Sequence, residues 1–299
     1  MPTNIKLLPN KRNEIFHFLF CPNCLYFLEQ RNEIKAKKCP MCSGDIEKAK
    51  YLIPEYGFEV KDLNLFRVSQ DGLRNYVYPD FPQLEKTKRK IPITKEIPYK
   101  PAPSGRVVSF LSSKGTAGAD EPRTIGKFTI TPYLRSQITV INLKSQVNIK
   151  SGLPIKLDRA GRRFRANLGY QFYTDILVIN PPFWGEKKPN EAYLSLLYAL
   201  LEGASQALDI NREDIDGILY PSEDTELVIY DNVPAGAGFI REIYENFENI
   251  LAKAEEIVSN CSCSEDSCCP SCILHYSNQY FADILQRQAA LELIRIGKG

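Results

Sequence analysis

CSCSEDSCCPSC, residues 261–272, places five of the chain's nine cysteines within twelve consecutive positions. The stretch contains a CxC pair (Cys261 and Cys263) and a CxxC pair (Cys269 and Cys272). Two such pairs on a short loop can bring four thiolates to one tetrahedral site, which suits structural zinc. By count Cys268 could replace Cys269, but only Cys269 has the CxxC spacing. An iron–sulfur cluster is the chemical alternative, because four cysteines also bind one.

A second set of paired cysteines lies near the N-terminus, in Cys21-Pro-Asn-Cys24 and Cys39-Pro-Met-Cys42, with fourteen residues between the pairs. Two facing CxxC turns complete a four-sulfur site, and this spacing is typical of a zinc ribbon. Gly44 follows the second pair, where we expect a tight turn with positive φ. The sequence therefore predicts two zinc sites, the first held by Cys21, Cys24, Cys39 and Cys42.

The overall composition is that of an ordinary folded protein, with 43% apolar and 25% charged residues and a net charge of +2 over 299 residues. Contact with nucleic acid would therefore depend on local basic patches. No stretch approaches the roughly 18 consecutive apolar residues of a membrane span, and the first residues lack the apolar core of a signal peptide. We expect a cytoplasmic protein, whose reduced cysteines bind metal rather than form disulfides.

Two basic clusters are candidates for contact with nucleic acid. One lies in a connector whose prolines exclude helix, and the other lies on a glycine-containing turn. Their members are Lys86, Lys88, Arg89 and Lys90 in the first cluster, and Arg159, Arg162, Arg163 and Arg165 in the second. Arginine matches phosphate geometry well, but a solvated surface is the alternative for both clusters.

The predicted fold class is α+β, in three parts along the chain. Residues 1–50 form the zinc ribbon, and residues 51–105 form short strands and the basic, proline-rich connector. Residues 106–299 begin as a β-rich segment, with separate strands expected at 127–134 and 137–143, and run into a mixed α/β domain. The characteristic part of that domain is residues 190–299, where apolar residues recur at helical spacing on both sides of a glycine turn.

This C-terminal part resembles the MrfA-like zinc-binding domain, which lies at the C-terminus of a class of DEAD/DEAH-box superfamily 2 helicases and in the DrmB proteins of DISARM phage-defence systems. Relatives share a D-x-x-P-G-G-A-G turn, then C-x-C, C-x-x-C-L, Asn-Gln and a closing helix. The turn is matched by Asp231, Pro234, Gly236 and Gly238, with Ala235 in place of the first glycine. The resemblance implies that Cys261, Cys263, Cys269 and Cys272 are the zinc ligands, and that Asn278 and Gln279 lead into the last helix.

The chain contains no GxxxxGK[ST] motif and no DEAH-type box. The resemblance therefore implies a non-catalytic accessory subunit that partners a separately encoded helicase. Such a subunit would serve a DNA-processing or anti-phage defence complex and contact DNA or the motor. The alternative is a metal-dependent nuclease or another phosphoryl-handling enzyme, because paired carboxylates can hold Mg²⁺. Its candidate carboxylates are Asp231, Glu223, Asp224 and Glu226.

Overall fold

The computed structural model describes residues 4–6, 15–21, 27–29, 38–39, 43–52, 58–59, 96–100, 106–117, 121–149, 164–183, 190–220 and 225–299. They fall into two compact units. Unit 1 contains residues 1–16, 50–105 and 141–170, and unit 2 contains residues 17–49, 106–140 and 171–299. This grouping differs from a division in chain order, because the long strands β10 (Phe128–Ile149) and β11 (Phe164–Asn180) each run through both units.

The described strands of unit 1 are short and pair with one another or with β10 and β11, and these pairings are antiparallel except for one parallel pair that involves β11. Strand β1 (Asn4–Lys6) pairs with β5 (Phe58–Glu59) and β6 (Glu96–Lys100), and β6 pairs with β10. Strand β4 (Glu47–Leu52) runs parallel to β11, with Tyr51 opposite Asn167. The ring of Phe16 stacks on that of Tyr51, with ring centroids 4.9 Å apart.

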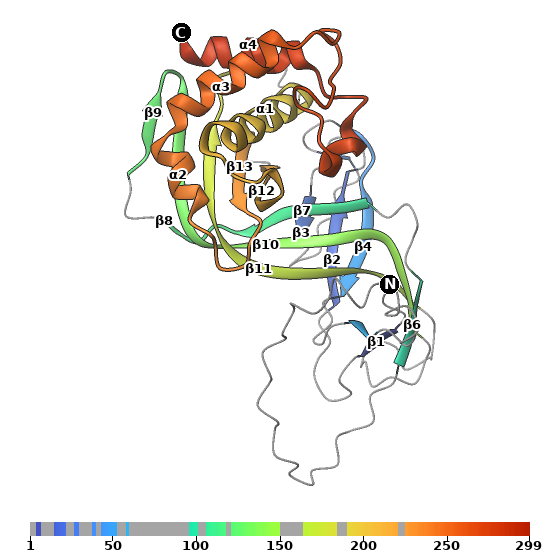
Figure 1. The fold of residues 1–299 in the computed structure, drawn as a ribbon. Helices are drawn as coiled ribbons and strands as arrows, with labels where there is room; N and C mark the ends of the chain where they lie inside the picture. The colour runs from blue at the N-terminus through green and yellow to red at the C-terminus, as the bar shows by residue number, and fades with distance from the viewer. Residues whose placement is uncertain are drawn as a thin grey trace, which may run out of the picture. The chain divides into compact units, whose positions relative to one another are not determined.

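Unit 2 holds the rest of the sheet. Strands β8 (Thr116–Ala117) and β9 (Arg123–Ile125) pair antiparallel with β10, as labelled in Figure 1. Strand β13 (Glu226–Asp231) lies between β11 and β12 (Ile215–Tyr220), antiparallel to both. The remaining strands are β7 (Arg106–Ser113), which pairs with β10, and β3 (Phe27–Glu29), which pairs with β2 (Ile15–Phe20).

The strands β11 and β13 are buried on both faces, which explains their uninterrupted apolar runs. Successive side chains of a strand point to opposite faces. Leu177 and Ile179 accordingly join the core beneath the helices, whereas Ile176 and Val178 join a second core on the other face. Strand β10 contributes to both cores, with Phe128 and Ile130 in the first and Ile138 and Val140 in the second.

One long strand replaces the two strands expected at 127–134 and 137–143. Strand β10 continues through this region, although Arg135 has φ 54°. The backbone N–H of Arg135 donates to Asp175 Oδ1 at 3.0 Å, so a side chain of β11 supports the local distortion. The local sequence pattern predicts a break between two strands at this polar position. It cannot show the supporting contact, because Asp175 lies 40 positions further along the chain.

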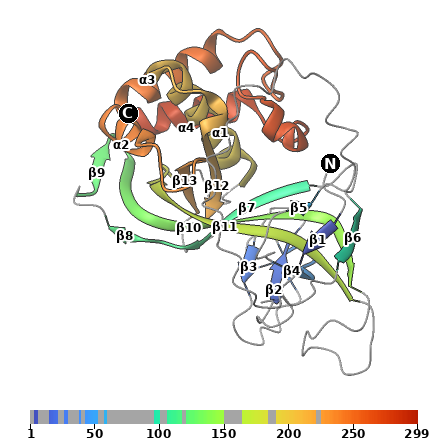
Figure 2. The same cartoon turned by 60° about the horizontal axis from the view of Figure 1, so that its bottom comes forward.

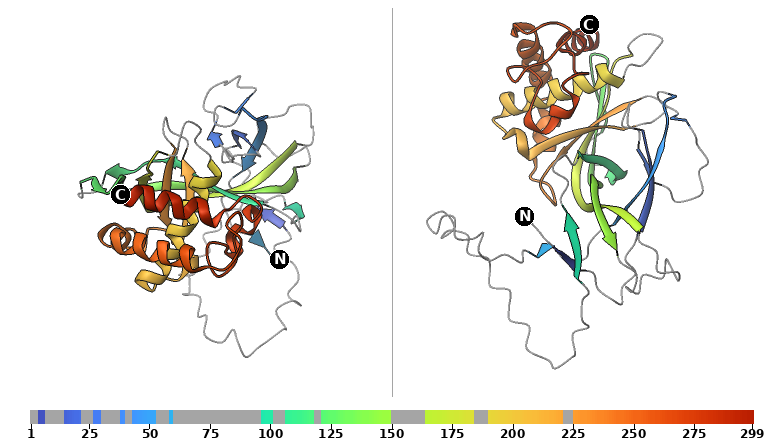
Figure 3. Two further views of the ribbon diagram at one scale, coloured as in Figure 1. Left: turned by 90° about the horizontal axis from the view of Figure 1, so that it is seen from above. Right: turned by 90° about the vertical axis from the view of Figure 1, so that its right-hand side faces the viewer.

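The helices of unit 2 form a layer on one face of the sheet (Figures 1 and 2). They are α1 (Asn190–Leu208), α2 (Phe239–Glu245), α3 (Phe247–Asn260) and α4 (Arg287–Lys298), with 3₁₀ helices η2 (Arg212–Asp214) and η3 (Tyr276–Phe281). Helix α1 packs on β12 and β13 and carries α3 and α4, which lie side by side (Figure 3).

Glycines permit the close approach of these layers. A Cβ on Gly217 of β12 would lie 2.7 Å from Leu197 Cδ1 of α1, and one on Gly203 of α1 would lie 2.9 Å from Ala254 Cβ of α3. The predicted α+β class is confirmed by these strands and helices. None of the helices within the described ranges has the length and apolar character needed to cross a membrane.

Candidate metal centre

The cysteine-rich loop begins where helix α3 ends. Asn260 is the last residue of α3, and Cys261 already has extended backbone, with φ −73° and ψ 136°. The chain then folds back on itself and reaches η3 at Tyr276. The fold therefore places the loop between the ends of two packed helices, α3 and α4.

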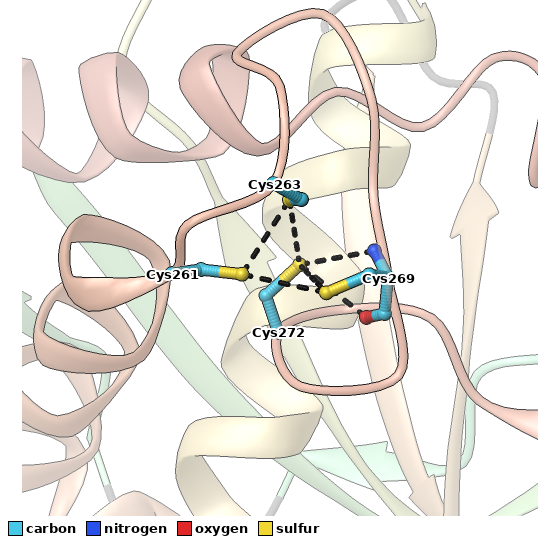
Figure 4. A group of neighbouring side chains, drawn as sticks. All are labelled: Cys261, Cys263, Cys269 and Cys272. Atoms are coloured by element: carbon cyan, nitrogen blue, oxygen red, sulfur yellow. Dashed lines mark hydrogen bonds between the residues drawn. The ribbon is translucent and has the colours of Figure 1, made fainter.

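Four thiols of this loop converge on one point (Figure 4). The Sγ atoms of Cys261, Cys263, Cys269 and Cys272 all lie within 4.8 Å of one another. Cys261 Sγ is 3.4 Å from the sulfurs of both Cys263 and Cys269, and Cys272 Sγ is 3.8 and 3.9 Å from those of Cys263 and Cys269. Zinc–sulfur bonds of about 2.3 Å in a tetrahedron require sulfurs about 3.8 Å apart. The donor set and its spacing therefore fit a zinc ion.

The CxxC pair is folded by backbone hydrogen bonds of its own. The N–H groups of Cys272 and Leu274 donate to the carbonyl of Cys269 at 3.0 and 3.2 Å. The N–H of Cys269 also donates to Cys272 Sγ at 3.3 Å. A donor pointing at sulfur favours the thiolate, the form that binds metal.

The pKa values of the thiols diverge across the cluster. The backbone N–H of Cys263, above all, lowers the pKa of Cys261 to about 7. Burial raises the pKa of Cys263 and, further, that of Cys272, which is 2% exposed. Four neighbouring thiolates need a cation to offset their mutual repulsion, so the arrangement suits a metal better than a free anionic cluster.

The remaining thiol, Cys268, lies apart from this group of four. Its Sγ is 3.6 Å from the carbonyl oxygen of Ala282, and burial raises its pKa. The structure thus groups Cys269, rather than Cys268, with the other three sulfurs.

Arg287, at the start of α4, holds the loop in place, and the sequence did not single it out. Its Nη1 donates to Val258 O at 3.1 Å and its Nη2 donates to Cys263 O at 3.0 Å. The backbone N–H groups of Arg287 and Gln288 donate to the carbonyls of Ser267 and Glu265. The available signal was a basic residue in the first turn of a helix, where the helix dipole disfavours a cation.

The step after the CxxC pair is fixed by Asn278, which is fully buried. Its Nδ2 donates to Ile273 O at 2.9 Å, and its Oδ1 accepts from the backbone N–H of His275 at 2.7 Å. Gln279 is exposed, and its carbonyl accepts from the N–H of Ala282. The Asn-Gln step therefore locks the segment between the thiols and α4.

Asp231 caps the glycine turn before α2. It is fully buried, its Oδ2 accepts from the N–H groups of Ala237 and Gly238 at 2.7 and 3.0 Å, and its Oδ1 accepts from that of Ile240 at 3.2 Å. Burial raises its pKa, the three N–H donors oppose that rise, and the charge of Asp175 adds to it. The turn itself has positive φ at Ala235, Gly236 and Gly238; Pro234 is exposed.

Of the other carboxylates considered for a nuclease, only Glu226 falls within the described residues. Glu226, at the opposite end of β13, pairs with Lys114, with Oε2 and Nζ 2.6 Å apart. Glu223 and Asp224 lie outside the described residues.

The N-terminal cysteines are described only in part. Cys21 and Cys39 are buried, whereas Cys24 and Cys42 lie outside the described residues. The N–H of Ser43 donates to Cys39 O and the N–H of Cys39 donates to Gly44 O, both at 2.8 Å. The expected positive φ at Gly44 was wrong, because Ser43 takes the left-handed conformation with φ 59°. The tight turn exists, one residue earlier.

The basic clusters fall largely outside the described residues. This applies to Lys86, Lys88, Arg89, Lys90, Arg159, Arg162 and Arg163. Arg165 lies in β11, where only its backbone is described.

Comparisons with known proteins agree with the centre's position. Residues 196–273 match the family model of the MrfA Zn-binding domain. Druantia protein DruE of Escherichia coli (strain UMEA 4076-1) is 26% identical over 156 residues, covering 46% of this chain and 8% of DruE. An uncharacterized protein of Methanocaldococcus jannaschii is 32% identical over 68 residues, covering 23% of this chain and 59% of that protein.

Among solved structures, the chain is similar to the DUF1998 helicase MrfA bound to DNA, with 16% identity, a TM-score of 0.42, and coverage of 66% of this chain and 26% of that one. For a second crystal structure of the DUF1998 helicase MrfA, the identity is 17% and the TM-score is 0.37, with coverage of 56% of this chain and 22% of that one. The chain thus spans only part of each of these relatives. The resemblance to the MrfA-like zinc-binding domain is therefore confirmed, and residues 196–273 are the part of the chain that matches its family model.

Proposed function

We propose that this protein is a non-catalytic, cytoplasmic accessory subunit of a separately encoded superfamily 2 helicase, and that its C-terminal domain is stabilised by one zinc ion. Cys261, Cys263, Cys269 and Cys272 would hold that ion. The observation that carries the proposal is the convergence of these four sulfurs within a segment that matches the MrfA Zn-binding domain. Zinc held by four protein sulfurs has no open position for a substrate, so its role would be structural.

The helicase-associated, defence-type role draws on the family match and on the similarity to a Druantia protein. More specifically, we propose that the protein belongs to a DNA-processing or anti-phage complex of the DISARM type, in which it would resemble DrmB. DNA contact, direct or through the partner, would involve the two basic clusters, since phosphate binding needs concentrated Lys and Arg.

The nuclease alternative finds less support in the geometry. A carboxylate that holds Mg²⁺ must offer oxygen lone pairs to the ion. Asp231 already accepts three backbone N–H groups, and Glu226 is paired with Lys114. These contacts suit a structural role for both residues.

We also propose a second zinc site at Cys21, Cys24, Cys39 and Cys42. Its support is the CxxC spacing together with the burial of Cys21 and Cys39 and the tight turn at Ser43. Metal analysis of the purified chain should then give about two zinc ions. A double Cys261→Ser, Cys263→Ser variant should lose one of them, and a brown protein containing iron and sulfide would contradict the zinc assignment.

The partner proposal is tested by affinity capture of the tagged chain from its native cells. A helicase should co-purify with the wild-type protein. A lone protein that binds neither a helicase nor DNA would contradict the accessory role. Magnesium-dependent cleavage of single- or double-stranded DNA that Asp231→Asn abolishes would favour the nuclease instead.

A further inference from the structure

We infer that Arg287 is a positioning residue for the four-cysteine centre: its guanidinium fixes the backbone of the CxC segment. This role rests on the proposed zinc site. Arg287 itself is no ligand, because it acts through the backbone of the segment that carries Cys261 and Cys263.

The geometry of the side chain places it across this segment. Its two terminal nitrogens donate to the carbonyls of Val258 and Cys263, which stand before and within the CxC pair. The guanidinium is a rigid planar fork, so these two hydrogen bonds fix the distance between the last turn of α3 and the second sulfur-bearing residue. Arg287 is only 9% exposed, so these hydrogen bonds are largely shielded from water.

The backbone at the start of α4 holds the rest of the loop. The first N–H groups of a helix have no partner within the helix. Those of Arg287 and Gln288 donate to Ser267 O at 3.0 Å and Glu265 O at 3.1 Å. Gln286 N, one residue earlier, donates to the buried Ser195 Oγ of α1 at 2.9 Å. The loop is thereby tied to the helix layer and not only to itself.

Arg287 is a buried charged side chain next to the cysteine-rich loop. Zinc with four thiolates carries a net charge of −2, and the acidic residues Glu265 and Asp266 lie in the same loop. Both side-chain acceptors of Arg287 are neutral backbone carbonyls, and its Nε is buried without a hydrogen-bond partner within the described part of the chain. A cation in the first turn of a helix opposes the helix dipole, which indicates that α4 alone does not account for it.

The test compares zinc release from purified full-length chains: the wild type, Arg287→Gln, Arg287→Lys and Arg295→Gln. Zinc transfer to a chromogenic pyridylazo chelator is followed over time. Second-sphere contacts typically change metal affinity by about 10- to 100-fold. We therefore expect one zinc to leave Arg287→Gln at least about tenfold faster than the wild type. The ammonium group of Arg287→Lys can keep one of the two hydrogen bonds but lacks the planar fork, so its rate should be intermediate.

Arg295→Gln is the matched control, because Arg295 is an exposed arginine of the same helix that pairs with Glu255 instead. Its zinc release should equal that of the wild type. A purely structural Arg287 would destabilise the zinc-free and zinc-loaded chains equally in urea, whereas a positioning role predicts a larger loss in the loaded chain.

The outcomes separate this inference from the proposed function. Equal release rates in the wild type, Arg287→Lys and Arg287→Gln would overturn the role of Arg287 and leave the zinc site intact. A wild-type chain without zinc at Cys261–Cys272 would overturn the zinc site itself. If Arg287→Gln does not fold, Arg287→Lys decides: release several-fold faster supports the inference, and wild-type release refutes it.

Discussion

Replacing Ala235 by glycine should stabilise the protein, although glycine usually does the opposite. Ala235 has φ 74°, a left-handed conformation that costs a residue with a Cβ about 1–2 kcal/mol. Glycine removes that cost but loses about 0.4–1 kcal/mol through its freer unfolded state. The net gain in unfolding free energy should be about 0.5–1 kcal/mol. The hydrogen bond from the N–H of residue 235 to Tyr173 O is unaffected.

Urea unfolding followed by circular dichroism measures this gain as a higher midpoint at unchanged slope. Ala237→Gly provides the matched control two residues away. Ala237 is also exposed but lies outside the left-handed region, so its glycine variant should lose about 0.4–1 kcal/mol. Two variants that shift stability in the same direction would refute the reasoning from backbone conformation.

Three further outcomes are expected. Cys272→Ser should release one zinc and lower the unfolding midpoint, as metal analysis and thermal melting would reveal, because a buried sulfur of the centre is lost; full zinc content would contradict it. A hydrogen bond from Lys298 lowers the pKa of Glu255. The ionised Glu255 therefore contributes to the unfolding free energy at neutral pH, and this contribution disappears as the pH falls through the lowered pKa. Glu255→Gln should therefore cost up to about 1 kcal/mol at pH 7 and nothing in strong acid, with an equal cost at both pH values counting against the ion pair. Gly203→Val should destabilise by about 1–3 kcal/mol in urea because its Cβ would overlap Ala254; a neutral effect would show that α1 and α3 can separate at little cost.

Local spacing was sufficient to predict the cysteine cluster. Its four thiols fall within twelve residues, and the CxxC geometry already favoured Cys269 over Cys268. The α+β class was also predictable from local sequence. The spacing of the apolar residues and the length of the apolar segment distinguish the helix α1 from the buried strand β11.

Contacts between distant segments could not be predicted in this way. Arg287 reaches Val258 across 29 positions, and nothing in its neighbouring residues indicates that partner. The left-handed residue of the N-terminal turn is Ser43 rather than Gly44. This turn is closed by two backbone hydrogen bonds, from the N–H of Ser43 to Cys39 O and from the N–H of Cys39 to Gly44 O. Strand β10 extends through Arg135 because Asp175 of β11 accepts its N–H.

The packing of the helix layer determines how the zinc-binding domain could be isolated. The family match ends at residue 273, but Leu285 and Leu293 near and within α4 belong to the same core as Leu197 of α1. Phe128 and Leu177, from strands well before residue 196, complete that core. A fragment cut at 196 and 273 would carry the cysteines on an open apolar surface. We therefore expect the smallest fragment that folds by itself to include β10, β11 and helix α4. The cysteine motif identifies the metal site of this unit but not its boundaries.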